Sequence, residues 1–210
     1  MAEIRETRAN CRKERDEYCR KSGLQLEGLG KAPAIYLIIH HILNLVPALY
    51  KRKEFYVSMF LFMLHTGVRY VTMSAIKLGD IERVSFFSDN TCLVLIKANR
   101  TKCNHAWGQP LHVEGFLNLN DENDKDNQSI MNIVYWLNEL LVLNFRLNLK
   151  QFKSWNLKEE DKSKYLWGNS HKMVSYQRVY KKFKEFYMNS GIKKNELGLH
   201  SFRSGFHCSA

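Results

Sequence analysis

The stretch LHTGVRYVTMSAIKLGDI, residues 64–81, decides how the rest of the chain is interpreted. It predicts the end of an apolar helix, a Thr66-Gly67 turn, and a second helix that Arg69 opens. The apolar side chains after the turn predict a buried stripe formed by Val68, Val71, Ile76 and Leu78. A guanidinium near a core needs a partner, and its planar fork suits a carboxylate or a phosphate. Two interpretations of Arg69 follow: an anion-binding residue, or a structural residue bonded to a neighbouring carbonyl or to Asp80.

Composition narrows the classes of protein to which the chain can belong. Its 210 residues, 45% hydrophobic, suffice for one good-sized domain, or for one domain with an arm. The 32 Lys and Arg against 21 Asp and Glu give a net charge of +11, which favours a nucleic acid or an anionic membrane as partner. A basic surface that meets only solvent is the alternative.

The cysteines indicate a reduced compartment and no metal centre. The chain has five Cys and no CxxC pair, so we expect an intracellular protein, nuclear in a eukaryotic host and otherwise cytoplasmic. Cys103, His105 and His112 lack a fourth ligand at a credible spacing, and we therefore expect no bound metal.

The first fifty residues predict an arm followed by a buried helix. Residues 3–21 are charged throughout, and glycines follow at 23, 28 and 30, so residues 1–30 are expected to form an arm or linker before a domain at 31–210. The apolar run 32–50 contains two histidines, an asparagine and Pro47, which are costly in lipid. We expect a buried core helix there and no membrane partner.

Periodicity predicts an α+β protein that is mostly α-helical, with a small antiparallel β-hairpin or sheet. The expected elements are a helix at 55–64, a strand at 91–96, a polar basic turn at 97–108, a returning strand at 110–113, an exposed loop at 118–128, and helices at 130–149 and 174–187. The last helix should bury Val179, Phe183 and Phe186, and should expose Arg178, Lys181, Lys182 and Lys184.

Basic residues that could bind an anion together occur at three places that are far apart in the sequence. The first is Arg69, and the second is the hairpin turn with Lys97, Arg100, Lys102 and His105. His200 and Arg203 form the third, and they would share one face of a helix for which Ser201 is a plausible N-cap. Two arginines, a lysine and a histidine in one cleft would bind an anion, and the natural candidate is a phosphodiester.

Two motifs resemble those of the tyrosine recombinases, the phage-integrase family, in order and spacing. They are Thr66-Gly67-Val68-Arg69, followed by Leu78-Gly79-Asp80-Ile81, and His200-Ser201-Phe202-Arg203. The resemblance covers roughly residues 34–210, and the HSFRSG string looks more like recombinases of eukaryotic mobile elements than like bacterial resolvases. It implies a tyrosine-recombinase-like catalytic domain that acts on double-stranded DNA without metal or small-molecule cofactor.

The resemblance also implies roles for single residues. Arg69 and Arg203 would grip the phosphate, Lys102 (with Lys97 as its rival) would protonate the leaving 5′ oxygen, and His200 would assist proton transfer. We further expect DNA contacts from the basic residues of the hairpin and of the last helix: Lys97, Arg100, His105, Arg178, Lys181 and Lys182.

The chain departs from the family pattern at three points. An acid usually stands where Thr72 does, and a histidine often stands where Ser204 does. No tyrosine follows Arg203, so the domain is expected to be truncated before the nucleophile helix, to bind DNA without cleaving it by itself, and to self-associate on DNA only weakly. The alternatives are a domesticated, non-catalytic DNA-binding module with the same fold, and a helical protein unrelated to DNA whose motifs arose by chance.

Overall fold

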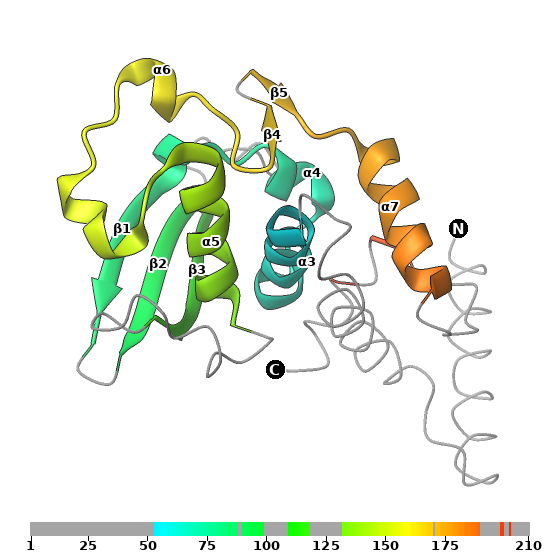
Figure 1. The fold of residues 1–210 in the computed structure, drawn as a ribbon, viewed down its shortest axis with the longest axis horizontal. Coiled ribbons are helices and arrows are strands. Elements are labelled where there is room, and N and C mark those ends of the chain that lie inside the picture. The colour runs from blue at the N-terminus through cyan, green and yellow to red at the C-terminus, as the bar shows by residue number, and fades with distance from the viewer. Residues whose placement is uncertain are drawn as a thin grey trace, which may run out of the picture.

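The computed structural model describes residues 53–87, 90–98, 109–117, 132–169, 171–189, 198–199 and 202 (Figure 1). The predicted arm at 1–30, the helix within 32–50 and the loop at 118–128 lie outside these residues. The described elements are α3 (Lys53–Thr66), α4 (Tyr70–Ser74), η1 (Leu78–Asp80), β1 (Ile81–Phe86), β2 (Thr91–Ala98), β3 (Gln109–Phe116), α5 (Ile133–Phe145), η2 (Leu149–Ser154), α6 (Glu159–Lys162), β4 (Gly168–Asn169), β5 (Lys172–Met173) and α7 (Tyr176–Asn189). The expected fold class, a mostly helical α+β protein with a small antiparallel sheet, is confirmed.

The sheet has three antiparallel strands in the order β1-β2-β3. Alternation along β2 is as predicted, because Cys92, Val94 and Ile96 are buried while Leu93 and Leu95 are only half-buried. The pairing of β2 with β3 runs from Thr91 opposite Phe116 to Ala98 opposite Gln109, so both strands are longer than expected. Lys97 therefore lies within β2 and not in the predicted turn.

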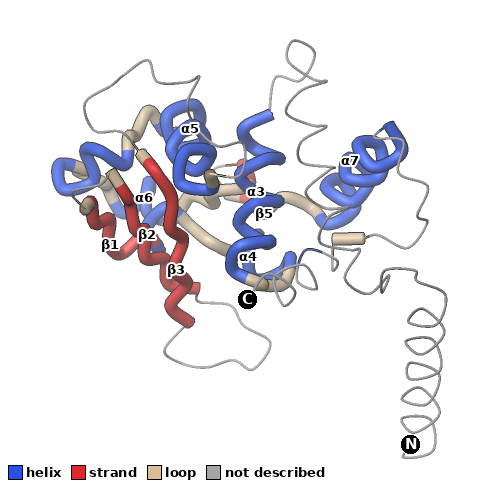
Figure 2. The backbone as a smooth tube through the Cα atoms, turned by 90° about the horizontal axis from the view of Figure 1, so that it is seen from below, coloured by secondary structure: helices blue, strands red, loops and turns tan. Residues whose placement is uncertain are grey.

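Helix α3 lies at the centre of the molecule, between the sheet with α5 on one side and α7 on the other (Figures 1 and 2). Its ten consecutive residues from Phe55 to Leu64 are all buried. On the α7 side, Tyr56 packs edge-on against Phe186 with ring centroids 5.7 Å apart, and Phe60 packs against Phe183 at 5.8 Å. A helix that is apolar all round needs such neighbours on every side.

The Thr66-Gly67 turn forms where the sequence predicts it. Gly67 has a φ of 63°, a conformation that glycine adopts without steric cost, and its N–H donates to the Met63 carbonyl at 3.0 Å, ending α3. Arg69 is the N-cap residue of α4. The predicted stripe is wrong at Val71, which is 51% exposed, because α4 is only five residues long and buries Thr72, Met73 and Ser74.

Helices α5 and α7 match their predicted buried faces. Val134, Leu137 and Leu141 are buried in α5, and the three expected apolar residues are buried in α7. The first of these helices is shorter than predicted because Arg146 adopts a left-handed conformation with a φ of 59°, which ends the helix after Phe145.

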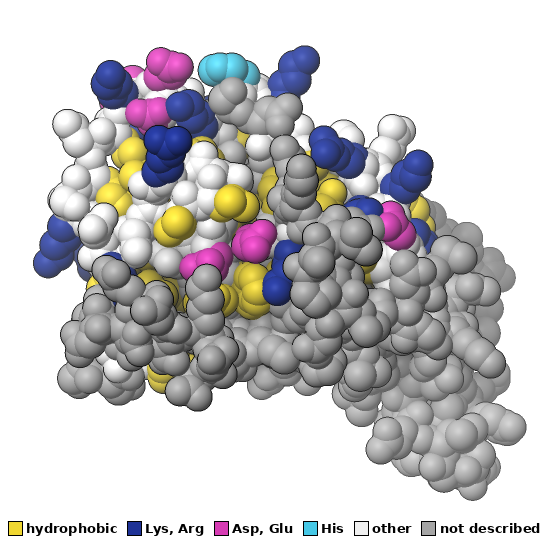
Figure 3. Space-filling view, in the orientation of Figure 1, with side chains coloured by type: hydrophobic (Ala, Val, Ile, Leu, Met, Phe, Trp, Pro, Cys, Tyr) yellow, Lys and Arg dark blue, Asp and Glu magenta, His cyan; other side chains and the backbone are white. Residues whose placement is uncertain are grey.

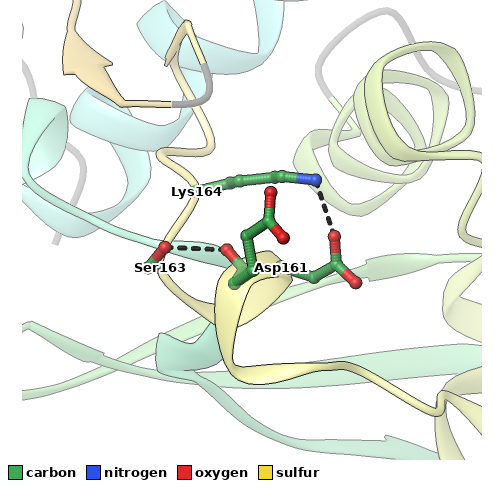
Figure 4. Close-up of polar contacts among 4 residues, drawn as sticks. Asp161, Ser163 and Lys164 are labelled. Carbon is green, nitrogen blue, oxygen red and sulfur yellow. Dashed lines mark hydrogen bonds and ion pairs between the residues drawn. The ribbon is translucent and has the colours of Figure 1, made fainter.

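The segment around α6 packs over η1 and is held by local polar contacts (Figure 4). Lys164 Nζ lies 2.6 Å from Asp161 Oδ1, and Ser163 Oγ donates to the Glu160 carbonyl at 2.7 Å. The Leu78 N–H donates to the Lys164 carbonyl at 2.8 Å, which joins this segment to η1. Within the described residues, no helix is long and apolar enough to cross a membrane.

Candidate nucleic-acid interface

Arg69 lies exposed at the turn between α3 and α4. Within the described part of the chain, its guanidinium makes no hydrogen bond or ion pair. Asp80 does not bind it, and the carboxylate of that residue accepts the Lys77 N–H at 2.8 Å. The interpretation of Arg69 as a structural residue bonded to Asp80 is therefore wrong, and so is the idea that its guanidinium is held against the core. The side chain is open to an external anion.

Tyr70, the next residue, connects this turn to the beginning of α7. Its ring meets the ring of Tyr176 edge-on, with centroids 5.2 Å apart at 84°, and its hydroxyl donates to the Val174 carbonyl. Burial, with a smaller effect of Tyr176, raises the pKa of Tyr70 to about 12, so the hydroxyl keeps its proton at neutral pH. Arg69 is thus one residue from this contact, and Arg178 is two residues from it.

Exposed basic side chains lie along β5 and the start of α7, where Figure 3 shows dark blue side chains at the upper right of the molecule. Lys172, Arg178 and Lys181 are exposed, and within the described residues the two on α7 make no side-chain ion pair. Lys182 is less available, because its Nζ lies 2.8 Å from both carboxylate oxygens of Glu185 and its side chain is 21% exposed. Arg178 and Lys181 are therefore better placed than Lys182 to meet a phosphate.

A hollow of about 200 Å³ lies at the start of α7. Lys172, Ser175 and Arg178 contribute to its polar side, and Phe55 and Tyr56 of α3 to its apolar side. Ser175 caps α7, because its Oγ accepts the Arg178 N–H at 3.3 Å. The two cations and the positive end of the helix dipole give this region a positive potential.

Lys97, the predicted rival for the acid, lies in β2 opposite Pro110. Its Nζ is 3.9 Å from Glu82 Oε1 of β1, and both side chains are more than 40% exposed. An exposed pair at this distance is worth less than about 1 kcal/mol, so Glu82 does little to hold Lys97 away from another anion.

Most of the predicted catalytic residues lie outside the described residues: Lys102, His200 and Arg203, together with Arg100 and His105 of the expected DNA contacts. Within the second motif the structure describes Phe202, which is fully buried and stacks on Phe60 of α3 with centroids 5.0 Å apart at 15°. Phe202 also meets Phe183 of α7 edge-on at 5.5 Å. This phenylalanine, which precedes Arg203 in the sequence, is therefore packed between α3 and α7.

A larger hollow of about 500 Å³ lies between the end of α5 and α6 and shares Gly168 with the first hollow. Its charged lining includes Asp161 and Lys164, which neutralise each other, and the bond from Lys164 lowers the pKa of Asp161. Among the described residues, no group of three or more His, Cys, Asp or Glu side chains is arranged to hold a metal ion.

Tyr70, Tyr176 and Lys172 were not among the residues predicted for this region. Tyr70 and Val174 are 104 residues apart, so no local pattern signals their hydrogen bond. Lys172 lies in a two-residue strand, β5, which pairs with β4 across a short turn. The available signal in the sequence was the Gly168-Asn169 pair, which itself forms β4 just before the turn.

Comparison with known proteins gives a fold-level likeness. No protein-family model matches the chain, and no curated protein matches it in sequence. Among solved structures, the chain is similar to the XerH site-specific recombinase bound to difH substrate in a pre-cleavage complex, with a TM-score of 0.49 and 15% identity. It is similar to the same extent to XerH bound to palindromic difH substrate in a post-cleavage complex. Each alignment covers 82% of this chain but only 39% and 38%, respectively, of the XerH chains, so this chain spans well under half of their length.

Proposed function

We propose that this chain is a DNA-binding domain of the tyrosine-recombinase type, in which Arg69 binds a backbone phosphate of double-stranded DNA. The observation that carries the proposal is the contact between Tyr70 and Tyr176, which joins the residue after the exposed Arg69 to the first turn of α7, the helix that carries the exposed Arg178 and Lys181. Exposed cations gathered from two separate elements suit the closely spaced phosphates of a duplex. The net charge of +11 favours the same partner.

The chemistry that we propose for the site follows the resemblance in the two motifs. Negative charge builds up on the non-bridging phosphate oxygens during strand transfer, and guanidinium forks from Arg69 and Arg203 would stabilise it. His200 would assist proton transfer, and a hairpin lysine, Lys102 or Lys97, would protonate the leaving 5′ oxygen. These roles need no metal ion.

One observation favours the alternative, a DNA-binding module without chemistry. Thr72, at the position where the family usually has an acid, is only 8% exposed, on the inner side of α4. A buried threonine carries no charge, so it cannot balance the guanidinium of Arg69 as a carboxylate would. The recombinase-type domain and the module without chemistry both require DNA binding through Arg69 and α7. DNA binding is therefore tested first.

The test compares the binding of a fluorescein-labelled DNA duplex by fluorescence anisotropy at salt concentrations between about 50 and about 200 mM. We expect the affinity of the unaltered protein to fall steeply with salt. Arg69→Ala and Arg178→Ala should each weaken binding and reduce the slope of log K against log salt by about one, because each removes one phosphate contact.

The matched control is Lys158→Ala, which removes one exposed positive charge at the start of α6, away from α7. The Lys158 side chain makes no capping hydrogen bond, so the change should leave the fold intact. We expect this variant to bind as the unaltered protein does. Equal losses in Lys158→Ala and Arg69→Ala would show that only net charge matters, and would overturn the proposed site.

A further inference from the structure

Three tyrosine rings connect segments that are far apart in the sequence. Tyr70 of α4 meets Tyr176 edge-on at 5.2 Å, and Tyr176 stacks on Tyr180, one turn further along α7, at 5.7 Å and 10°. Gly198 lies beside the last ring, because a Cβ placed on it would be 3.8 Å from Tyr180 Cε2. The column of rings therefore runs from the residue after Arg69 to a residue two positions before His200 in the sequence.

The beginning of α7 is fixed from two directions. Tyr70 donates its hydroxyl hydrogen to the Val174 carbonyl, while the Val174 N–H donates to the Trp167 carbonyl at 3.2 Å. The Trp167 indole N–H in turn donates to Ser58 Oγ of α3 at 3.0 Å, and both of these side chains are fully buried. Of the bonds that hold Val174, the one from Tyr70 is made by the residue next to Arg69, so it sets the position of α7 relative to that arginine.

We propose that Tyr70 is a positioning residue, which holds the Arg69 guanidinium in register with the basic face of α7 through its hydroxyl bond to Val174 and its ring contact with Tyr176. This inference rests on the proposed DNA-binding function. Groups that bind one rigid ligand together bind it more tightly when their relative positions are fixed beforehand. Tyr70 does not itself contact DNA in this scheme. A phenylalanine would keep the ring contact and lose the bond to Val174, which makes the hydroxyl testable by itself.

The experiment is a double-mutant cycle between Tyr70→Phe and Arg69→Ala, with DNA affinity and salt slope as readouts. If Tyr70 positions Arg69, Tyr70→Phe should weaken DNA binding by about fivefold and reduce the salt slope toward that of Arg69→Ala. In the Tyr70→Phe background, Arg69→Ala should then cost clearly less affinity than it does in the unaltered protein. If the hydroxyl had only a structural role, Tyr70→Phe would lower stability, and Arg69→Ala would cost the same affinity with or without it.

Tyr165→Phe provides the matched control, because it removes a hydroxyl from a half-buried tyrosine that follows α6, pairs with Lys77 and is not a member of the column of rings. It should bind DNA as the unaltered protein does. A second variant, Tyr176→Leu, removes the ring contact at a half-exposed position and keeps the Tyr70 hydroxyl. It should also weaken DNA binding, and in its background Arg69→Ala should cost less affinity than in the unaltered protein.

The outcomes separate this inference from the function on which it rests. If the unaltered protein binds DNA with a dependence on Arg69 but Tyr70→Phe binds equally well, the positioning role is overturned and the proposed function stands. If DNA affinity does not depend on Arg69 at all, both fall together. Additive effects of Tyr70→Phe and Arg69→Ala would likewise overturn the positioning role.

Discussion

Arg146 occupies a backbone conformation that its side chain makes costly. It follows the last residue of α5 with φ 59° and ψ 33°, and its N–H donates to the Val142 carbonyl at 3.0 Å. Glycine is the usual residue at such a helix end, because it has no Cβ to clash in the left-handed region. Arg146→Gly should therefore raise the free energy of unfolding by about 1 kcal/mol, which urea denaturation measures.

Arg146→Ala separates the conformational effect from the loss of charge. Alanine also lacks the guanidinium but keeps the Cβ, so its stability should stay within about 0.5 kcal/mol of the unaltered protein. If both variants were stabilised equally, charge and not backbone conformation would be responsible. A loss of stability in Arg146→Gly would mean that the arginine side chain holds the end of α5.

At the scale of single residues, the sequence was most informative where local chemistry decides the structure. Gly67 adopts the conformation that the Thr66-Gly67 turn requires, and Arg69 opens α4 as predicted. The burial of Val71 was predicted wrongly, and of the two interpretations of Arg69 the bond to Asp80 is not found, since both depend on how long α4 is and on what packs against it. For Lys102, His200 and Arg203, the catalytic roles remain predictions.

Elements with a regular hydrophobic pattern were predicted from the sequence, and those whose pattern is interrupted were not. Helix α7 and strand β2 follow their periodic hydrophobic patterns closely, while α3 was recognised by a continuous apolar run. Strand β1 carries Glu82 and Arg83, both exposed, at a place where its register with β2 shifts, so it lacks the two-residue alternation by which strands are recognised. The pairing with β2 forms this strand despite its unfavourable local pattern.

The packing of Phe202 between α3 and α7 gives a prediction at the scale of elements. Its ring fills the space between Phe60 and Phe183, so Phe202→Ala would leave a cavity lined by aromatic rings. We expect a loss of about 3–5 kcal/mol in the free energy of unfolding, measured in urea. Phe202→Leu keeps most of the volume and should cost less than about 1.5 kcal/mol.

The same pair of variants tests whether residue 202 belongs to the core. Equal small losses in both would mean that Phe202 contributes no packing to α3 and α7. A large loss in Phe202→Ala alone would show that the second motif is joined to the core through its central aromatic residue. No pattern in the sequence signals this packing, since the notable features of that motif are its polar residues, His200 and Arg203.

At the scale of the whole molecule, the proposed interface depends on contacts between distant parts of the chain. The bond from Tyr70 to Val174 spans 104 residues, and the bond from Trp167 to Ser58 spans 109. Periodicity and composition report on neighbours within a turn or two, so they could supply the basic residues of α7 but not the contact between α7 and the residue after Arg69. The order of the two motifs was the only sequence signal that these segments belong together.

Buried neutral groups in three elements predict how the stability of the whole molecule depends on alkaline pH. Burial is the main cause that raises the pKa to about 12 for Tyr70 of α4, Cys92 of β2 and Tyr135 of α5. In the unfolded chain these groups ionise near pH 10 for tyrosine and near pH 8.5–9 for cysteine. The folded state therefore favours the neutral form. The stabilisation that these neutral groups give to the folded state is complete below about pH 8.5. It is lost as the pH rises through the pKa values of the unfolded chain toward 12.

The urea midpoint should therefore fall as the pH is raised from about 8 to about 11. Lysine side chains also lose their charge in this range, so the informative quantity is the difference between the unaltered protein and the double variant Tyr70→Phe/Tyr135→Phe. Phenylalanine cannot ionise, and the midpoint of the double variant should fall less over the same interval. Parallel pH profiles for the two proteins would show that the two phenols are as easily ionised in the folded state as in the unfolded chain, and that their burial contributes nothing to alkaline stability.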